Sequence, residues 1–130
     1  MQPVFKVILP GGTAHDYTRY IDREGLTPER NDIDADGAGR NLLDGDMYRS
    51  RITKKQKMTV KLLRTDETVI LQLATDLDRE FVTIRYLNPE TNTVVDKVFY
   101  CSSIVYGAQM YDRSLQKTVY EGCTFSLIER

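Results

Sequence analysis

The chain has 130 residues, of which 41% are hydrophobic and 28% are charged, and its formal net charge is −1. This length suits one domain over residues 1–130 with a modest core, and the composition excludes disordered and fibrous chains. The chain lacks a run of about 18 apolar residues that could span a membrane, and its first residues lack the pattern of a signal peptide, so we expect synthesis in the cytoplasm.

The first elements in chain order are predicted to be short strands. Val4–Leu9 is an apolar run that ends at the turn signal Pro10-Gly11-Gly12. Tyr17–Ile21 is a candidate second strand. A long acidic loop is predicted over about residues 22–46, because its glycines reach positive φ and its aspartates and asparagines favour turns.

Charge is distributed unevenly between that loop and the segment that follows it. Residues 22–46 hold eight acidic residues and three arginines, whereas residues 47–64 hold seven basic residues and no acidic one. Adjacent blocks of opposite sign can set the register between subunits. They can equally be two solvated faces of one chain.

Part of the acidic loop resembles a calcium-binding EF-hand loop. Asp32, Asp34 and Asp36 occupy the first, third and fifth positions of that motif, and Gly37 occupies the sixth. The twelfth position, which should be a bidentate glutamate, is Leu43, and the flanking segments lack a helical pattern. Calcium binding through Asp32–Asp36 is therefore the weaker of two hypotheses for this segment, and no cofactor is predicted.

Residues 47–63 are predicted to form a long strand or a bent pair of strands. Met58, Val60 and Leu62 alternate with polar residues, which predicts one buried face and one wet face. Its basic residues could contact a nucleic-acid backbone. Lysines on an exposed strand also prevent aggregation, and the near-neutral net charge disfavours nucleic acid as a partner.

The period of the hydrophobic pattern changes after residue 64. Apolar residues then recur at helical spacing, at Val69, Ile70, Leu73, Ala74 and Leu77. Thr65 or Asp66 is a suitable N-cap, and acidic residues in the first turn favour the positive end of the helix dipole. We predict one α-helix over about residues 66–79.

The rest of the chain returns to strand patterns. Phe81–Leu87 and Thr93–Cys101 should form a hairpin around a turn at residues 88–92, Lys117–Ile128 a last strand, and residues 104–115 a loop or bulged strand. The predicted fold is mainly β, with an antiparallel β-sandwich or barrel and one flanking helix.

Residues that could carry catalysis are few. His15 is the single histidine, and Cys101 and Cys123 lie in apolar, strand-like runs where a cysteine is usually a small buried hydrophobe. One histidine and two distant cysteines lack the paired spacing of a zinc site, and a phosphate-binding glycine loop is absent. We therefore predict no enzyme, no metal site and no small-molecule substrate.

Several segments resemble small virion proteins of tailed phages. They are residues 39–49 (GRNLLDGDMYR), 57–62 (KMTVKL), 99–102 (FYCS) and 120–129 (YEGCTFSLIE), and the resemblance covers most of the chain from about Tyr17 onward. It implies a phage or prophage tail protein with a fold related to tail-tube and distal tail proteins. It also implies assembly into rings with other tail proteins as partners, and incorporation into the virion tail after synthesis in the bacterial cytoplasm.

The acidic loop and the basic strand are the predicted assembly interface. In a ring, the loop of one subunit would contact the basic strand of its neighbour, because carboxylates attract arginine and lysine side chains. Arg40 could instead fold back onto its own loop. The predicted interface residues are Asp32, Asp34, Asp36, Arg40, Asn41, Asp44, Arg49, Arg51, Lys54, Lys55 and Lys57.

Overall fold

The computed structural model describes residues 2–34, 39–40, 47–48 and 51–130, with side chains described for residues 2–30 and 54–130. These residues form twelve strands, one short 3₁₀-helix and one α-helix. In chain order they are β1 (Phe5–Ile8), β2 (Ala14–Asp16), η1 (Thr18–Tyr20), β3 (Ile21–Asp34), β4 (Gly39–Arg40), β5 (Met47–Tyr48), β6 (Arg51–Leu62), β7 (Thr65–Asp66), α1 (Glu67–Leu77), β8 (Val82–Asn88), β9 (Thr93–Val105), β10 (Ala108–Asp112), β11 (Lys117–Glu121) and β12 (Thr124–Glu129).

One antiparallel sheet of seven strands, in the order β2-β1-β8-β9-β12-β6-β3, makes up most of the molecule. Two smaller sheets have the orders β10-β11-β7 and β4-β5. The prediction of a mainly β, antiparallel fold is confirmed. The large sheet does not close into a barrel, because its two end strands, β2 and β3, do not pair with each other in the described part of the chain.

The large sheet curls around its own core. β1 and β12 are three positions apart in the strand order, a separation of about 14 Å in a flat sheet. Yet the rings of Phe5 on β1 and Phe125 on β12 have centroids 5.9 Å apart. The sheet therefore bends so that alternate side chains of its strands share one buried interior with α1.

An apolar cleft of about 380 Å³ remains where the curled sheet stays open. Its walls come from both sides of the opening, with Phe5 and Tyr86 on one side and Leu26, Pro28 and Met58 on the other. On the β1 side of the opening, β2 pairs with Lys6–Ile8, and the backbone of Phe5 is hydrogen-bonded instead to Tyr17 and Thr18.

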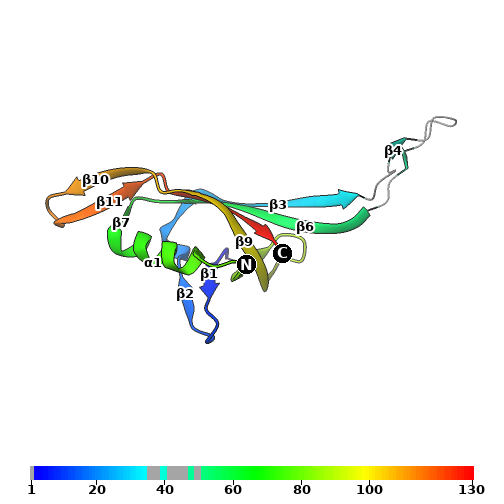
Figure 1. The fold of residues 1–130 in the computed structure, drawn as a ribbon, viewed down its shortest axis with the longest axis horizontal. Coiled ribbons are helices and arrows are strands. Elements are labelled where there is room, and N and C mark those ends of the chain that lie inside the picture. Colours follow the sequence, from blue (N-terminus) through cyan, green and yellow to red (C-terminus); the bar gives the residue numbers. More distant parts are fainter. Residues whose placement is uncertain (1, 35–38, 41–46, 49–50) are drawn as a thin grey trace.

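The predicted helix is confirmed, as α1. The side chain of Asp66 accepts a hydrogen bond from the backbone N–H of Val69 at 3.1 Å, which is the N-cap expected from the sequence. Ile70, Leu73 and Leu77 are buried. Figure 1 shows α1 beside the part of the sheet that carries β1 and β2.

The prediction of an acidic loop over residues 22–46 is wrong for residues 22–34, which belong to β3. Strand β3 lies at the end of the sheet and obtains its backbone hydrogen bonds from β6. Such an edge strand tolerates charged side chains and needs no apolar alternation, so its sequence looks like a loop. Residues 35–38 and 41–46 lie outside the described residues.

Two further boundaries differ from the predictions. Residues 18–20 form a 3₁₀ turn that connects β2 to β3 and not a strand. The predicted last strand is divided into β11 and β12 at Gly122, whose φ of +87° is accessible to glycine and costly for other residues. This break transfers β11 to the small sheet while β12 stays in the large one.

Candidate functional site

Strands β3 and β6 continue beyond the rest of the large sheet as a two-stranded arm, residues 30–34 and 51–56. β12 pairs with β6 only from Lys57 to Lys61, whereas β3 pairs with β6 as far as Asp34 opposite Arg51. Figure 1 shows this arm extending from one end of the molecule and the β10–β11 hairpin from the other. Within the described residues, no third strand pairs with the arm.

The predicted interface residues fall into three groups with respect to this arm. The structure describes the side chains of Lys54, Lys55 and Lys57, all on β6. It describes only the backbone of Asp32, Asp34, Arg40 and Arg51. The remaining ones, Asp36, Asn41, Asp44 and Arg49, lie outside the described residues.

The β3–β6 register places the acidic and basic blocks opposite each other within one chain. Asp32 is the register partner of Lys54, Asp34 that of Arg51, and Glu29 that of Lys57. Opposite charges at facing positions stabilise a strand pair modestly. The register therefore brings acidic and basic positions of the same chain opposite each other, an arrangement that local charge patterning did not predict.

The backbone around Asp32 and Asp34 differs from that of a calcium-binding loop. Both residues lie in extended strand β3, paired with β6. An EF-hand loop turns sharply over these positions to bring its ligands around one ion. Among the described side chains, no group of three or more histidine, cysteine, aspartate or glutamate residues could hold a metal ion. Calcium binding stays a prediction.

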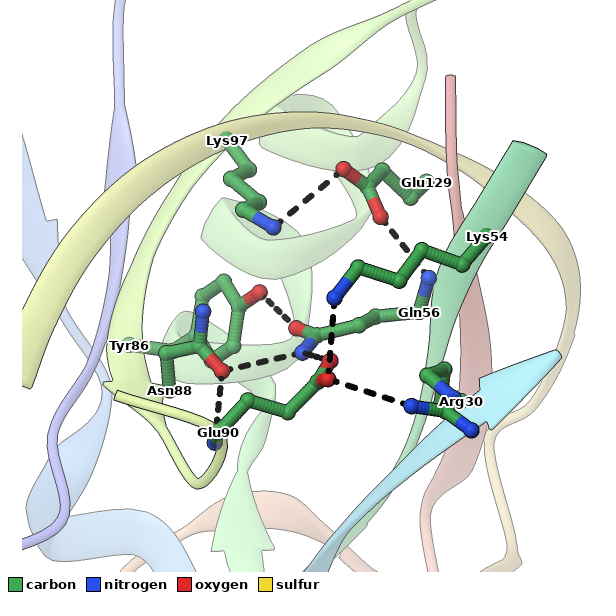
Figure 2. Close-up of polar contacts among 8 residues, drawn as sticks. All are labelled: Arg30, Lys54, Gln56, Tyr86, Asn88, Glu90, Lys97 and Glu129. Atoms are coloured by element: carbon green, nitrogen blue, oxygen red, sulfur yellow. Dashed lines mark hydrogen bonds and ion pairs between the residues drawn. The ribbon is translucent and has the colours of Figure 1, made fainter. Parts of the chain in front are cut away.

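Glu90 connects the arm to the β8–β9 turn. One of its carboxylate oxygens lies 3.3 Å from Lys54 Nζ and 3.5 Å from Arg30 Nη1, so it contacts both strands of the arm. The other oxygen accepts a hydrogen bond of 2.8 Å from Gln56 Nε2. Figure 2 shows these contacts converging on Glu90 at the root of the arm.

Gln56 forms the buried part of the same network. Its amide nitrogen donates to Asn88 Oδ1 at 2.9 Å, and its amide oxygen accepts a hydrogen bond from the hydroxyl of Tyr86. All three side chains are buried. Burial raises the pKa of Tyr86 to about 12, so its hydroxyl remains protonated and can donate at neutral pH.

Glu129 extends the network to the C-terminal strand. It accepts a hydrogen bond of 2.7 Å from the backbone N–H of Gln56 and lies 3.4 Å from Lys97 Nζ. The backbone of β6 is thus held by a side chain just beyond its last pairing with β12. Together with Glu90, this contact fixes the direction in which the arm leaves the sheet.

The charge of Glu90 predicts a pH-dependent stability. Hydrogen bonds from Gln56 and Lys54, in that order, lower the pKa of Glu90. A carboxylate with a lowered folded-state pKa stabilises the fold above its unfolded pKa, and that contribution is lost as the pH falls through the folded-state pKa. Glu90→Gln should therefore be less stable than the parent at pH 7, and this deficit should shrink as the pH falls toward about 3.

Denaturant unfolding of both proteins at the two pH values measures this difference. Glu80→Gln is the matched control, because Glu80 is exposed. A Glu90→Gln deficit that is the same at both pH values would contradict the assignment of the effect to the Glu90 charge.

A second polar cluster joins β2 to α1. Asp76 is buried on α1 and its Oδ2 lies 2.7 Å from His15 Nδ1 and 2.5 Å from the hydroxyl of Tyr17, which donates to it. Burial first, and then the hydrogen bond to Asp76, raises the pKa of Tyr17. The sequence pattern predicts Asp76 on the polar side of the helix, and this is wrong: Asp76 is buried, because its carboxylate has His15 and Tyr17 as partners.

The two cysteines are free, and their environments differ from that of a catalytic thiol. Burial raises the pKa of Cys123 to about 11 and also raises that of Cys101. A nucleophilic thiol needs a lowered pKa, so neither environment favours the thiolate. His15 is instead a partner of Asp76.

A protein-family model described as a family of unknown function (DUF6711) matches residues 7–130. No curated protein matches the chain. In the described residues, no helix is long and apolar enough to cross a membrane.

Proposed function

Because this chain belongs to DUF6711, a family of unknown function, we propose its role from its own sequence and structure. It is a structural component of a phage or prophage tail, in the tube, distal tail or baseplate region. It assembles into rings, with the arm of each subunit seated on a neighbouring copy. Its partners are further copies of itself and other tail proteins, and it acts without catalysis.

The observation that carries this proposal is the arm itself. A two-stranded ribbon alone in water is marginally stable, because it buries little apolar surface. The β3–β6 arm nevertheless continues past the last pairing with β12 and ends in a further two-stranded ribbon, β4–β5. A contact with another subunit would supply the missing burial.

The root of the arm supports the same proposal. Glu90, Gln56 and Glu129 hold both strands in one direction relative to the sheet. A projecting element that is fixed in this way loses little conformational freedom when it binds a neighbour, so more of the contact energy contributes to affinity. The resemblance of residues 39–49 and 120–129 to phage virion proteins points to the tail as the assembly.

Light scattering across protein concentration, at low and high salt, tests the proposal. We expect a closed ring that dissociates toward monomer as salt screens the charged arm. Successive residues of a strand point to opposite faces, so Lys55 lies on the outer face of the arm and Lys54 on the other face. Lys55→Glu should therefore weaken ring association about tenfold.

Lys61→Glu is the matched control. Lys61 also lies on the outer face of β6, but on the part that pairs with β12 in the body of the sheet. A monomer at every concentration, or equal effects of the two substitutions, would overturn assembly through the arm. Reversal of Asp32 and Asp34 is a poorer test, because it would place like charges opposite Lys54 and Arg51 in the same chain.

A further inference from the structure

The edge strands of the described sheets differ in their protection against pairing with other strands. β2 and β7 are three and two residues long, and β3 carries Pro28, Glu29 and Arg30. Short length, proline and charge are the usual ways of blocking an edge. β10 (AQMYD) has no proline and no charged residue before its last one, Asp112, and it pairs on one side only, with β11. It is an edge open to a further strand.

An apolar groove lies beside this open edge. It has a volume of about 680 Å³ and is lined from α1 by Glu67 and Leu71, from the end of β9 by Val105, and from the β9–β10 connection by Tyr106 and Gly107. Leu71 is 69% exposed and Val105 is 65% exposed. Exposed apolar side chains gathered around a hollow are typical of an interaction surface.

Tyr111 projects on the same side of the hairpin as the groove. Gln109 and Tyr120 are register partners, joined by a hydrogen bond of 3.0 Å, and both line the groove. Tyr111 is two residues after Gln109, so it lies on the same face of β10. It is 64% exposed. Such a tyrosine is well suited to fill a pocket on another protein.

We propose that β10 pairs with β10 of a second copy, antiparallel about a two-fold axis at Met110. This inference rests on the proposed self-assembly but uses a surface at the opposite end of the molecule from the arm (Figure 1). In this register Gln109 faces Tyr111 of the partner subunit, on the groove side. Each copy thereby inserts its Tyr111 toward the groove of the other.

Charge supports a second copy as the occupant. Gly107 directly precedes β10 and Arg113 directly follows it, so at each end of the two-fold pairing Arg113 of the partner subunit comes close to Gly107, which lines the groove together with Glu67. Glu67 and Arg113 are both exposed, and neither has an ion pair within the described part of the chain. The two-fold axis brings these opposite charges together twice, while the neighbouring Asp112 is already paired with Arg64 at 3.7 Å.

Gly107 makes the approach possible. Its φ of +92° and the contact that an added Cβ would make with the backbone oxygen of Glu121 both require glycine there. The chain can therefore turn from β9 into β10 with its backbone close to β11.

A charge exchange tests the pairing. Arg113→Glu and Glu67→Arg should each weaken the two-fold association about tenfold or more, because each places like charges opposite one another. The double variant should recover to within about threefold of the parent, since the pair is restored with its signs exchanged. Sedimentation equilibrium measures the association, and circular dichroism confirms that each variant is folded.

The Lys55→Glu background separates this inference from the proposed function. A dimer that persists in Lys55→Glu and is lost in Lys55→Glu/Arg113→Glu supports the β10 pairing, whatever becomes of the ring. A two-fold association that is equally strong in the parent, both single variants and the double variant would overturn the β10 pairing and leave assembly through the arm standing. If each single variant weakened the two-fold association and the double variant did not recover it, the β10 pairing would also be overturned.

Discussion

Replacing Gln56 with alanine is expected to lower the free energy of unfolding by about 3 kcal/mol. The substitution leaves the buried hydroxyl of Tyr86 without its acceptor and removes one of the two hydrogen bonds that the buried Asn88 Oδ1 accepts. It also removes the hydrogen bond to Glu90. Urea unfolding followed by circular dichroism measures the loss, and faster amide hydrogen exchange in β6 would locate it at the root of the arm.

Lys55→Ala is the control for that experiment. Lys55 is the next residue on the same strand, it lies on the opposite face, and it is only half-buried. It should change stability by less than about 0.5 kcal/mol. Equal losses in Gln56→Ala and Lys55→Ala would mean that strand propensity, and not the buried network, determines the stability of this region.

Replacing Asp76 with alanine is expected to cost about 2–4 kcal/mol. The carboxylate is buried and has two partners, so its removal leaves the hydroxyl of Tyr17 buried without an acceptor and releases His15. Thermal unfolding measures the loss. Asp76→Asn should lose less than Asp76→Ala, because the amide oxygen can still accept the hydrogen bond from Tyr17.

Asp78→Ala is the matched control for Asp76→Ala. Asp78 lies just beyond the end of α1 and is exposed. The same chemical change there should be nearly neutral. If Asp76→Ala were as mild as Asp78→Ala, the link between β2 and α1 would be unimportant for the fold.

The elements that sequence analysis located well have a strong local pattern. α1 combines an N-cap at Asp66 with apolar residues at helical spacing, and these signals suffice because a helix forms its hydrogen bonds within one segment. The β8–β9 hairpin was predicted for a similar reason, since its two strands flank one short turn.

The elements that it located poorly depend on distant partners. β3 has a charged sequence that resembles a loop, and it is a strand because β6 lies beside it. The division of Lys117–Ile128 into two strands reflects the different sheets that β11 and β12 join. A local pattern carries no information about which neighbour a strand will find.

The candidate site shows the same division. The uneven charge of the sequence indicated that the segments forming the arm are unusual. The sequence could not show that acidic and basic residues of one chain face each other. Three residues fix the arm, and they are far apart in the sequence. Gln56 contacts Glu90, which lies 34 residues further along the chain, and Glu129, which lies 73 residues further along. Nothing in their spacing predicts that they meet.

By itself, the sequence determined the single helix, the mainly β character and the uneven charge, because hydrophobic period, capping and composition are local quantities. Only the tertiary structure decided the curl of the sheet, the direction of the arm and the open edge at β10. These depend on contacts between residues far apart in the chain, for which the chain must first close long loops, and burial and hydrogen bonding select among the possible pairings.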